Sequence, residues 1–276
     1  MVQDMAFESI TDFVEGGQYA DKANVQAYSQ KFIYYLDPNC SEDSPMHDEN
    51  LRKAVFSAID QDGLITALGG AYSRLYAYAN DYYSDYDMVD WAGLDNYNSK
   101  TSVNADTVKQ YLDASEYNGE TMTLMVMSTF ADTATIIAAQ LAAYGINVEL
   151  LQVDNATANA TQADSTAWDM TFGMMAGDYN VQAWLHDFSY NNTPTGDRTS
   201  TFIVDDEWND LLNLCNTEDG HTTENMQAWW KMATDHAYTM GIYAGNNYNI
   251  VPENCIYVCQ GDKLRFLPGA CCFKAE

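Results

Sequence analysis

The sequence has 276 residues, of which 47% are hydrophobic, and a formal net charge of −28 that comes from 12 Lys and Arg against 40 Asp and Glu. This length and hydrophobic content allow a sizeable core and exclude global disorder, and no apolar run approaches the roughly 18 residues that a membrane-spanning helix needs. The negative charge repels nucleic-acid phosphates and anionic lipid headgroups, so we expect no nucleic acid among the partners.

The first strong periodicity predicts a helix that begins near Asp48. Its apolar residues recur with the spacing of a helix that buries one face: Leu51, Ala54, Val55, Ala58 and Ile59. The adjacent Gly69 and Gly70 indicate a turn in the segment that follows this helix. The tyrosine-rich stretch from Tyr72 to Ser102 has little periodicity, and we expect an extended surface loop there.

Element types alternate from residue 104 onward. A short helix is followed by a strand over Thr121–Ser128, a helix over Thr133–Tyr144 and a strand over Ile146–Val153. Gly145 is suited to the left-handed cap that ends a helix. The order strand–helix–strand with short connectors predicts a βαβ unit, in which a right-handed crossover makes the two strands parallel neighbours.

The next predicted elements are a strand over Trp168–Met175 and helices over Asp206–Cys215 and Glu224–Met240. The adjacent Trp229 and Trp230 lie on different faces of the second helix, so we expect one in the core and the other half-exposed. Together with the βαβ unit, these elements place the chain in the α/β class.

The tail over Gly241–Phe273 alternates short apolar stretches with Gly and Pro, which predicts strands and turns. It holds four of the six cysteines: Cys255, Cys259, Cys271 and Cys272. Whether two of these four cysteines form a disulfide stays an open question. The Cys-x-x-x-Cys spacing is not that of a zinc ribbon, and no His lies close enough in the sequence to complete a zinc site.

The sequence carries no recognisable catalytic motif. Its histidines are scattered, and the adjacent His186 and Asp187 would point apart in a regular element. Serine-nucleophile and phosphate-loop motifs are absent, and the acidic stretch Asn80–Asp90 lacks the spacing of a calcium loop. We therefore expect no catalytic residue, no cofactor and no bound metal. A weak divalent-cation site among the surface carboxylates is the alternative.

The segment Pro45–Asp60 resembles a signature of the peptide/nickel-type extracytoplasmic solute-binding proteins of ABC transporters, family 5. Members carry a proline, a few polar residues and an Arg-x-Ala helix that ends in an Ala-x-Asp sequence. The residues that match in order and spacing are Arg52, Ala54, Ala58, Ile59 and Asp60.

Three further stretches resemble the same family and follow its order. They are Asn104–Gly119, the helix-to-strand passage Ala138–Val148, and Trp168–Met170 followed by the loop Gly177–Asn180. The resemblance implies a periplasmic-binding-protein-like fold, in which a mixed, partly parallel sheet flanked by helices forms the second ligand-binding lobe.

The resemblance also implies that the chain corresponds to the C-terminal half of such a receptor. We expect residues 36–237 to form the second lobe, and residues 1–35 and 238–276 to be strands and crossovers of the first lobe. Met1–Ile10 lacks the basic start and apolar core of a secretory signal. We therefore expect a truncated piece of an exported, lipid-anchored parent, without its N-terminal lobe.

The resemblance implies a ligand site in the loop after the strand at Trp168–Met175. Asp178 stands where peptide-binding members hold the ligand's α-amino group, and a desolvated ammonium does require a carboxylate partner. Met175 stands where the family has a stacking Trp, and Phe172 where peptide binders often have a basic residue for the ligand's carboxylate. An Asx-turn within the loop is the alternative role for Asp178.

Aromatic residues near this loop are further candidates for the cleft wall. They are Tyr179, Trp184 and Tyr190, which offer large contact area at low entropic cost; for Trp184, core packing is the alternative.

The expected function is solute binding outside the cytoplasm, with delivery of short peptides to an ABC permease and no catalysis. Because Met175 and Phe172 depart from the family pattern, a nickel chelate, an oligosaccharide or another small solute is an alternative ligand. A carboxylate-based hydrolase is a further alternative, supported only by the abundance of acidic residues.

Overall fold

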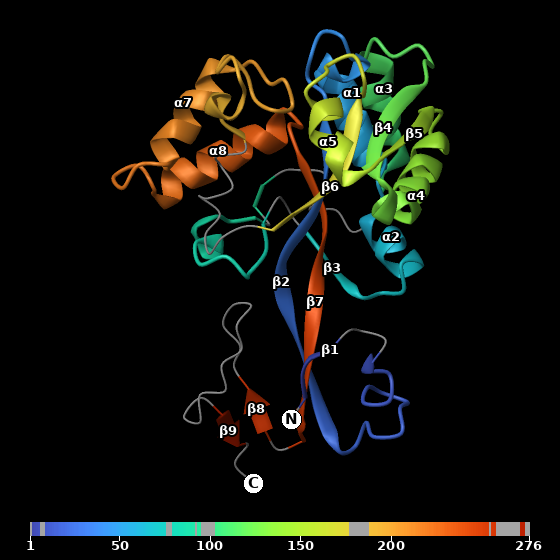
Figure 1. Cartoon of the computed structure of the whole chain (residues 1–276), viewed down its shortest axis with the longest axis vertical. Coiled ribbons are helices and arrows are strands. Elements are labelled where there is room, and N and C mark those ends of the chain that lie inside the picture. Colours follow the sequence, from blue (N-terminus) through green and yellow to red (C-terminus); the bar gives the residue numbers. More distant parts are fainter. Residues whose placement is uncertain are drawn as a thin grey trace.

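The computed structural model describes residues 2–5, 9–75, 79–91, 93–94, 103–176, 188–253, 255–257 and 271–273. A seven-stranded mixed sheet has the strand order β1-β7-β2-β6-β4-β5, with β3 also paired to β7, and a separate two-stranded sheet joins β8 and β9 (Figure 1). The strands are β1 (Val2–Met5), β2 (Ala23–Pro38), β3 (Tyr72–Arg74), β4 (Met122–Met127), β5 (Val148–Val153), β6 (Met170–Ala176), β7 (Met240–Pro252), β8 (Cys255–Tyr257) and β9 (Cys271–Phe273).

Helices cover both faces of the large sheet (Figure 1). They are α1 (Glu49–Ala58), α2 (Gln61–Ala67), α3 (Ala105–Ala114), α4 (Ala131–Ala142), α5 (Asn155–Gln162), α7 (Asp206–Cys215) and α8 (Thr223–Asp235). Short 3₁₀ turns lie at η2 (Pro45–His47), η3 (Tyr86–Met88), η5 (Ser128–Phe130) and η7 (Tyr190–Asn192). The predicted α/β class with a mixed, partly parallel sheet flanked by helices is confirmed. No helix in the described part of the chain is both long and apolar enough to cross a membrane.

The βαβ unit predicted from the sequence is confirmed. β4 and β5 are parallel neighbours in register from Met122↔Val148 to Met127↔Val153, and α4 connects them. Gly145 has a φ of +79°, the left-handed conformation that glycine adopts without strain. β6 adds a third parallel strand on the other side of β4.

A long antiparallel ribbon joins the two ends of the chain. β2 pairs with β7 from Ala23↔Pro252 to Leu36↔Met240, and the last part of β2 also pairs with β6 from Phe32↔Ala176 onward. The ribbon therefore leaves the helix-covered part of the sheet and extends toward both termini (Figure 1). The domain boundaries expected near residues 36 and 237 fall within β2 and just before β7, and they stay a prediction.

The expectation of a surface loop over Tyr72–Ser102 is wrong for the part that the structure describes. The segment contributes β3 and a set of buried apolar side chains that pack with α7 and α8: Leu75, Ala79, Tyr83, Val89, Trp91 and Leu94. Two of the aromatic residues here have buried rings, and their polar atoms donate hydrogen bonds to backbone carbonyls. Tyr83 donates to Lys31 O at 2.8 Å, and the indole of Trp91 donates to Tyr86 O at 2.8 Å. An irregular backbone has no periodicity, so the pattern gave no sign of this burial.

Two expectations about α8 are also wrong. Trp229 and Trp230 are both buried, because Trp208 packs on the first and Trp91 on the second, with ring centroids 4.3 and 5.1 Å apart. The helix ends at Asp235 rather than at Met240. Ala237, at a φ of +51°, ends it in a Schellman turn, with Tyr238 N–H on Ala233 O at 2.9 Å and Ala237 N–H on Thr234 O at 3.2 Å.

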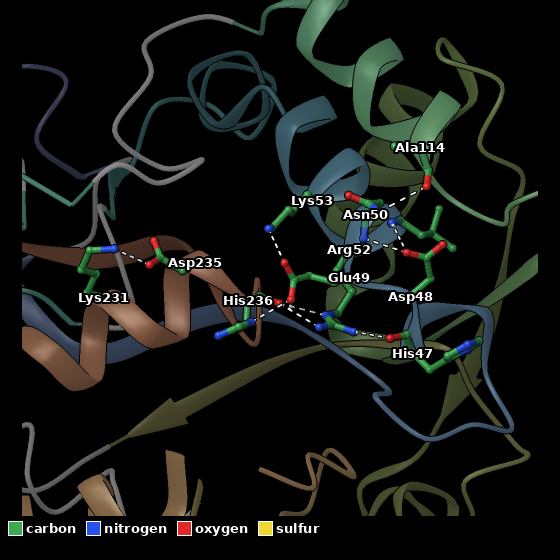
Figure 2. A network of polar contacts seen from close by, with 11 residues as sticks. His47, Asp48, Glu49, Asn50, Arg52, Lys53, Ala114, Lys231, Asp235 and His236 are labelled. Carbon is green, nitrogen blue, oxygen red and sulfur yellow. Dashed lines mark hydrogen bonds and ion pairs between the residues drawn. The ribbon is translucent and has the colours of Figure 1, made fainter. Parts of the chain in front are cut away.

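Arg52 on α1 connects three parts of the fold, and within the described residues it has no carboxylate partner (Figure 2). Its Nη1 donates to Met46 O at 2.9 Å and His47 O at 2.8 Å, at the end of η2. Its Nε and Nη2 donate to His236 O at 3.1 and 2.9 Å, at the end of α8. Backbone carbonyls at helix ends carry partial negative charge, so they stabilise a buried guanidinium.

Glu49 adds a second connection between the same two helices (Figure 2). Its carboxylate lies 2.7 Å from the Nδ1 of His236 and also pairs with Lys53. Burial acts to raise the pKa of Glu49, but hydrogen bonds and charge from Lys53 and His236 outweigh it, and the pKa lies below its ordinary value.

Replacement of Arg52 by Lys should destabilise the fold by about 2–4 kcal/mol, because an ammonium cannot reach the three carbonyls that the planar guanidinium spans. Urea denaturation would measure the loss. Lys109→Gln is the control, since the Lys109 side chain is 71% exposed in an ion pair with Asp113, and it should cost less than about 1 kcal/mol. Equal losses for the two variants would contradict the structural role of Arg52.

Candidate functional site

A cavity of about 540 Å³ lies beside the carboxyl end of β6, among β2, β6, α5 and the segment 188–202; we call it the β6 cavity. This volume falls within the range of small-molecule sites, and ligands of α/β sheets commonly bind at the carboxyl ends of parallel strands. Its lining residues are Tyr35, Asp37, Asn159, Gln162, Ala163, Met175, Phe188, Asn192, Thr193, Pro194, Thr195, Arg198, Thr199, Ser200 and Phe202.

The strand wall of the β6 cavity follows from the two-residue alternation of β2. Tyr35 and Asp37 lie on one face of the strand, and Tyr34 and Leu36 face the opposite core. Tyr35 pairs with Gly173 of β6, and a Cβ on Gly173 would lie only 2.5 Å from the Tyr35 hydroxyl. Gly173 therefore leaves the space that the Tyr35 side chain occupies over β6.

Asp37 is a buried carboxyl on this wall, with 5% of its surface exposed. It accepts a hydrogen bond from the hydroxyl of Thr239 at the start of β7. Burial raises the pKa of Asp37 to about 7, and the Thr239 hydrogen bond offsets only part of that rise. Near neutral pH this carboxyl can therefore either accept or donate a hydrogen bond in the cavity.

The helix wall comes from α5, which begins after Asp154. The Asp154 carboxylate accepts hydrogen bonds from the backbone N–H of Ala156 at 3.0 Å and Thr157 at 2.9 Å, as an N-cap does. Asn159 and Gln162 are three residues apart, so their side-chain amides share the face that lines the cavity. They supply both donors and acceptors.

The third wall contains a strained residue, Phe202, at a φ of +62°. A bulky side chain seldom adopts this left-handed conformation, so surrounding contacts must hold it. The buried Thr199 supplies them: its hydroxyl accepts from Ile203 N at 3.0 Å, and its carbonyl accepts from Phe202 N at 3.0 Å. Cys40 N–H donates to Thr201 O at 2.9 Å and attaches the turn to the chain after β2.

Arg198 lies on the Phe202 ring, with its Cζ 5.2 Å from the ring centroid. Its Nη1 donates to Asp197 Oδ1 at 3.0 Å and to Thr195 Oγ1 at 3.4 Å. Its Nε is buried and has no hydrogen-bond partner among the described residues. The guanidinium therefore retains capacity for a further acceptor.

Five of the six residues predicted for the site from the sequence fall into three groups. Met175 is half-buried and lines the β6 cavity. Phe172 is 1% exposed and lies on the opposite face of β6, where its ring centroid is 6.0 Å from that of Phe130 and 6.2 Å from that of Tyr243. Asp178, Tyr179 and Trp184 lie outside the described residues, so their roles stay predictions.

Tyr190, the remaining aromatic candidate, is 9% exposed and is not among the residues that line the cavity. Its hydroxyl accepts a hydrogen bond from the backbone N–H of Asp205, and burial raises its pKa. It therefore positions the segment before α7.

Sequence reasoning missed Asp37, Arg198 and Phe202. Asp37 did leave a signal, since it is a lone carboxyl at the end of the apolar run Phe32–Leu36. Arg198 left a weaker one, as one of only 12 basic residues in a strongly acidic chain. The backbone conformation of Phe202 left none, because a phenylalanine is not expected at positive φ.

The β6 cavity has the chemistry of a binding site. Its described lining offers hydroxyls, amides, one carboxyl, one guanidinium and aromatic rings, and it contains no His or Cys beside a nucleophile. Within the described residues, no group of three His, Cys, Asp or Glu side chains could hold a metal ion. Burial raises the pKa of the Cys40 and Cys215 thiols to about 11 each.

The open, partly parallel α/β sheet flanked by helices has the periplasmic-binding-protein-like fold. The family model for bacterial extracellular solute-binding proteins, family 5 (middle), matches residues 3–197. This chain belongs to that family, whose members are extracytoplasmic solute-binding proteins. The resemblance found in the sequence is confirmed.

Three of the solved structures that are similar to this chain are the following. The murein tripeptide binding protein MppA of Escherichia coli has a TM-score of 0.68 at 16% identity, covering 91% of this chain and 48% of its own. The oligopeptide-binding protein AppA of Bacillus subtilis, in complex with a nonapeptide, has a TM-score of 0.66 at 13% identity, with 96% and 55% covered. NikA of Staphylococcus aureus, in complex with Ni(L-His)₂, has a TM-score of 0.65 at 15% identity, with 94% and 54% covered.

At these identities the likeness shows the fold alone. The chain spans about half the length of the solved structures that it matches. No curated protein matches the sequence significantly.

The raised pKa of Asp37 predicts a pH dependence of stability. A buried acid whose folded pKa of about 7 exceeds its unfolded value of about 4 binds more protons in the folded state, so stability falls as pH rises between these values. Between pH 4.5 and pH 7.5 the free energy of unfolding of the wild-type chain should fall by a few kcal/mol, on the order set by this difference in pKa. Asp37→Asn should remove that fall, and denaturant unfolding at the two pH values measures it. The exposed Asp113→Asn is the control. A wild-type slope retained in Asp37→Asn would contradict the assignment.

Proposed function

We propose that this chain forms the ligand-binding lobe of an ABC-importer receptor and that its ligand is a short peptide. The observation that carries the proposal is the β6 cavity, in which aromatic walls alternate with amides and hydroxyls beside the carboxyl end of β6. A peptide presents backbone donors and acceptors together with side chains of varied polarity, and a lining of this mixed kind suits it.

The relatives support the same ligand class. MppA is a murein tripeptide binding protein, and AppA is an oligopeptide-binding protein that was solved in complex with a nonapeptide. Asp178 remains the proposed partner of a ligand's α-amino group, and Met175 and Asp37 line the β6 cavity. Tyr179 and Trp184 remain proposed cleft residues. Phe172 would contribute only indirectly, by packing in the core on the opposite face of β6.

A nickel chelate is the second candidate. NikA, in complex with Ni(L-His)₂, is as similar in fold as the peptide-binding relatives. The burial of Phe172 also favours it, because the position where peptide binders often have a basic residue holds a core aromatic ring here. The described cavity lining has no His, so a chelate would have to bring its own metal ligands.

The proposed partners are an ABC permease, which would receive the solute, and an N-terminal lobe that closes over the cavity. The family membership and the coverage of about half of each solved relative support both. We propose further that the working receptor is exported and held at the outer face of the membrane by a lipid anchor, and that it catalyses no reaction. Two-lobe receptors close on a ligand by hinge motion, which requires binding alone.

Calorimetry with di- to pentapeptides, Ni(L-His)₂ and maltotriose tests the proposal, with mass spectrometry of the same mixtures to detect products. We expect saturable binding of at least one peptide and no turnover. Met175→Ala should weaken that binding about tenfold, because it removes apolar contact from the cavity wall. The control Val204→Ala, at a side chain that is 74% exposed and outside the cavity, should not.

Binding of the nickel complex with no peptide bound would replace the first candidate by the second. Peptide or glycoside products would overturn the non-catalytic function.

A further inference from the structure

The carboxyl of Asp37 keeps one oxygen without a partner among the described residues. The residue is 5% exposed, and its Oδ1 accepts a hydrogen bond from the Thr239 hydroxyl. Its Oδ2 accepts no hydrogen bond from the described residues, and it is not one of their fully covered polar atoms that lack a partner. Because Asp37 lines the β6 cavity, the surface that this oxygen keeps is open to a ligand. A buried acceptor without a donor costs free energy, and a donor from the ligand would recover that cost.

The charges around Asp37 favour a cation as that donor. Within the part of the chain that the structure describes, no Lys, Arg or His forms an ion pair with Asp37. Arg198, the only cation among the described lining residues, lies 3.0 Å from the carboxylate of Asp197 instead. The net charge of −28 attracts positively charged solutes to the chain. An ammonium or a guanidinium would supply both the missing donor and the missing counter-charge.

The cavity surface near Asp37 is apolar and aromatic. Tyr35 lies two residues before Asp37 on the same face of β2 and covers Gly173 of β6. Met175 also lines the cavity, and both Tyr35 and Met175 pack against the hydrophobic cluster that contains Phe188. The alkyl stems of Lys and Arg pack on such surfaces, and aromatic rings attract their charged ends. This lining therefore suits a cation at the end of an alkyl chain.

Asp37 is distant from the carboxyl end of β6. It pairs with Thr171, whereas the strand continues to Ala176. At about 3.3 Å per residue, the two ends of this stretch are on the order of 15 Å apart. Asp178, the proposed partner of the α-amino group, follows the carboxyl end of β6 in the sequence. An α-amino group is also attached to the peptide backbone without an alkyl stem, so the cation that suits Asp37 is a different group of the ligand.

We infer that Asp37 forms a subsite of the β6 cavity for a cationic side chain, so that the preferred solute is a peptide that contains Lys or Arg. The inference deepens the proposed peptide-binding function and rests on it. It adds a preference for side-chain charge to a function that so far specifies only the peptide backbone and its α-amino group.

Three pairs of alanine-based tripeptides test this subsite by calorimetry at about pH 8, where Asp37 is ionised. Each pair carries Lys or norleucine at one of the three positions, so its members share both termini and the alkyl stem and differ only in the ammonium group. We expect the wild-type chain to bind the Lys member of at least one pair about tenfold to one hundredfold tighter, the scale of a charged hydrogen bond. Asp37→Asn should bring this ratio close to one, because the amide keeps the size of the side chain but not its charge. Asp113→Asn, which changes the net charge equally at an exposed site, should keep the full ratio.

An unchanged ratio in Asp37→Asn, with wild-type near-ultraviolet circular dichroism, would overturn the subsite, and so would the absence of a Lys preference in all three pairs. If the wild-type chain binds none of these tripeptides, the proposed peptide function fails, and n-butylammonium, the lysine side chain alone, then tests Asp37 by itself. A saturable shift of the Asp37 carboxyl resonance in ¹³C NMR, at constant ionic strength, would support a subsite for an alkylammonium solute. No shift up to about 0.5 M n-butylammonium, on the order of a hundred times a Kd of a few millimolar, would overturn it.

Discussion

The buried guanidinium of Arg52 is the constraint on which the arrangement of the helices depends. It joins the ends of η2 and α8 through three carbonyls (Figure 2). Its Cζ lies 5.5 Å from the centroid of the Tyr238 ring. The Tyr238 hydroxyl donates to Asp205 Oδ2 at 2.8 Å, and Asp205 caps α7. Because an arginine stays charged at any depth, these carbonyls must remain in place, and they fix α7 and α8 against α1.

The β6 cavity is a consequence of that arrangement. The backbone N–H of Asp205 donates to the hydroxyl of Tyr190, so the network that begins at Arg52 reaches the segment that forms the third cavity wall. Within this wall, the hydrogen bond from Ile203 N–H to the Thr199 hydroxyl helps to hold Phe202 in its strained backbone conformation. The opposite wall follows from β2, whose alternation directs Tyr35 and Asp37 to the cavity and Leu36 to the core. Ordered, well-packed supports of this kind hold polar groups ready for a ligand.

The errors made from the sequence have a shared physical origin. The stretch from Tyr72 to Ser102 and the pair Trp229-Trp230 are rich in amphipathic aromatic residues, whose burial depends on which surfaces meet in three dimensions. The end of α8 was misplaced because a non-glycine residue, Ala237, adopts the left-handed cap. For the site, the family motif indicated the end of β6 and included Met175, but it could not indicate Asp37 or Arg198, which reach the cavity from distant parts of the chain.

The sequence by itself determined the elements with strong periodicity, the parallel pair of β4 and β5, the α/β class and the family, because local spacing and short motifs encode them. Only the tertiary structure decided which side chains share a cavity. Phe172 and Met175 are three residues apart and lie on opposite faces of β6, whereas Asp37 and Arg198 are far apart in sequence and line one space. The physical reason is that a binding site is defined by the packing of surfaces, and packing depends on contacts that no local window of the sequence contains.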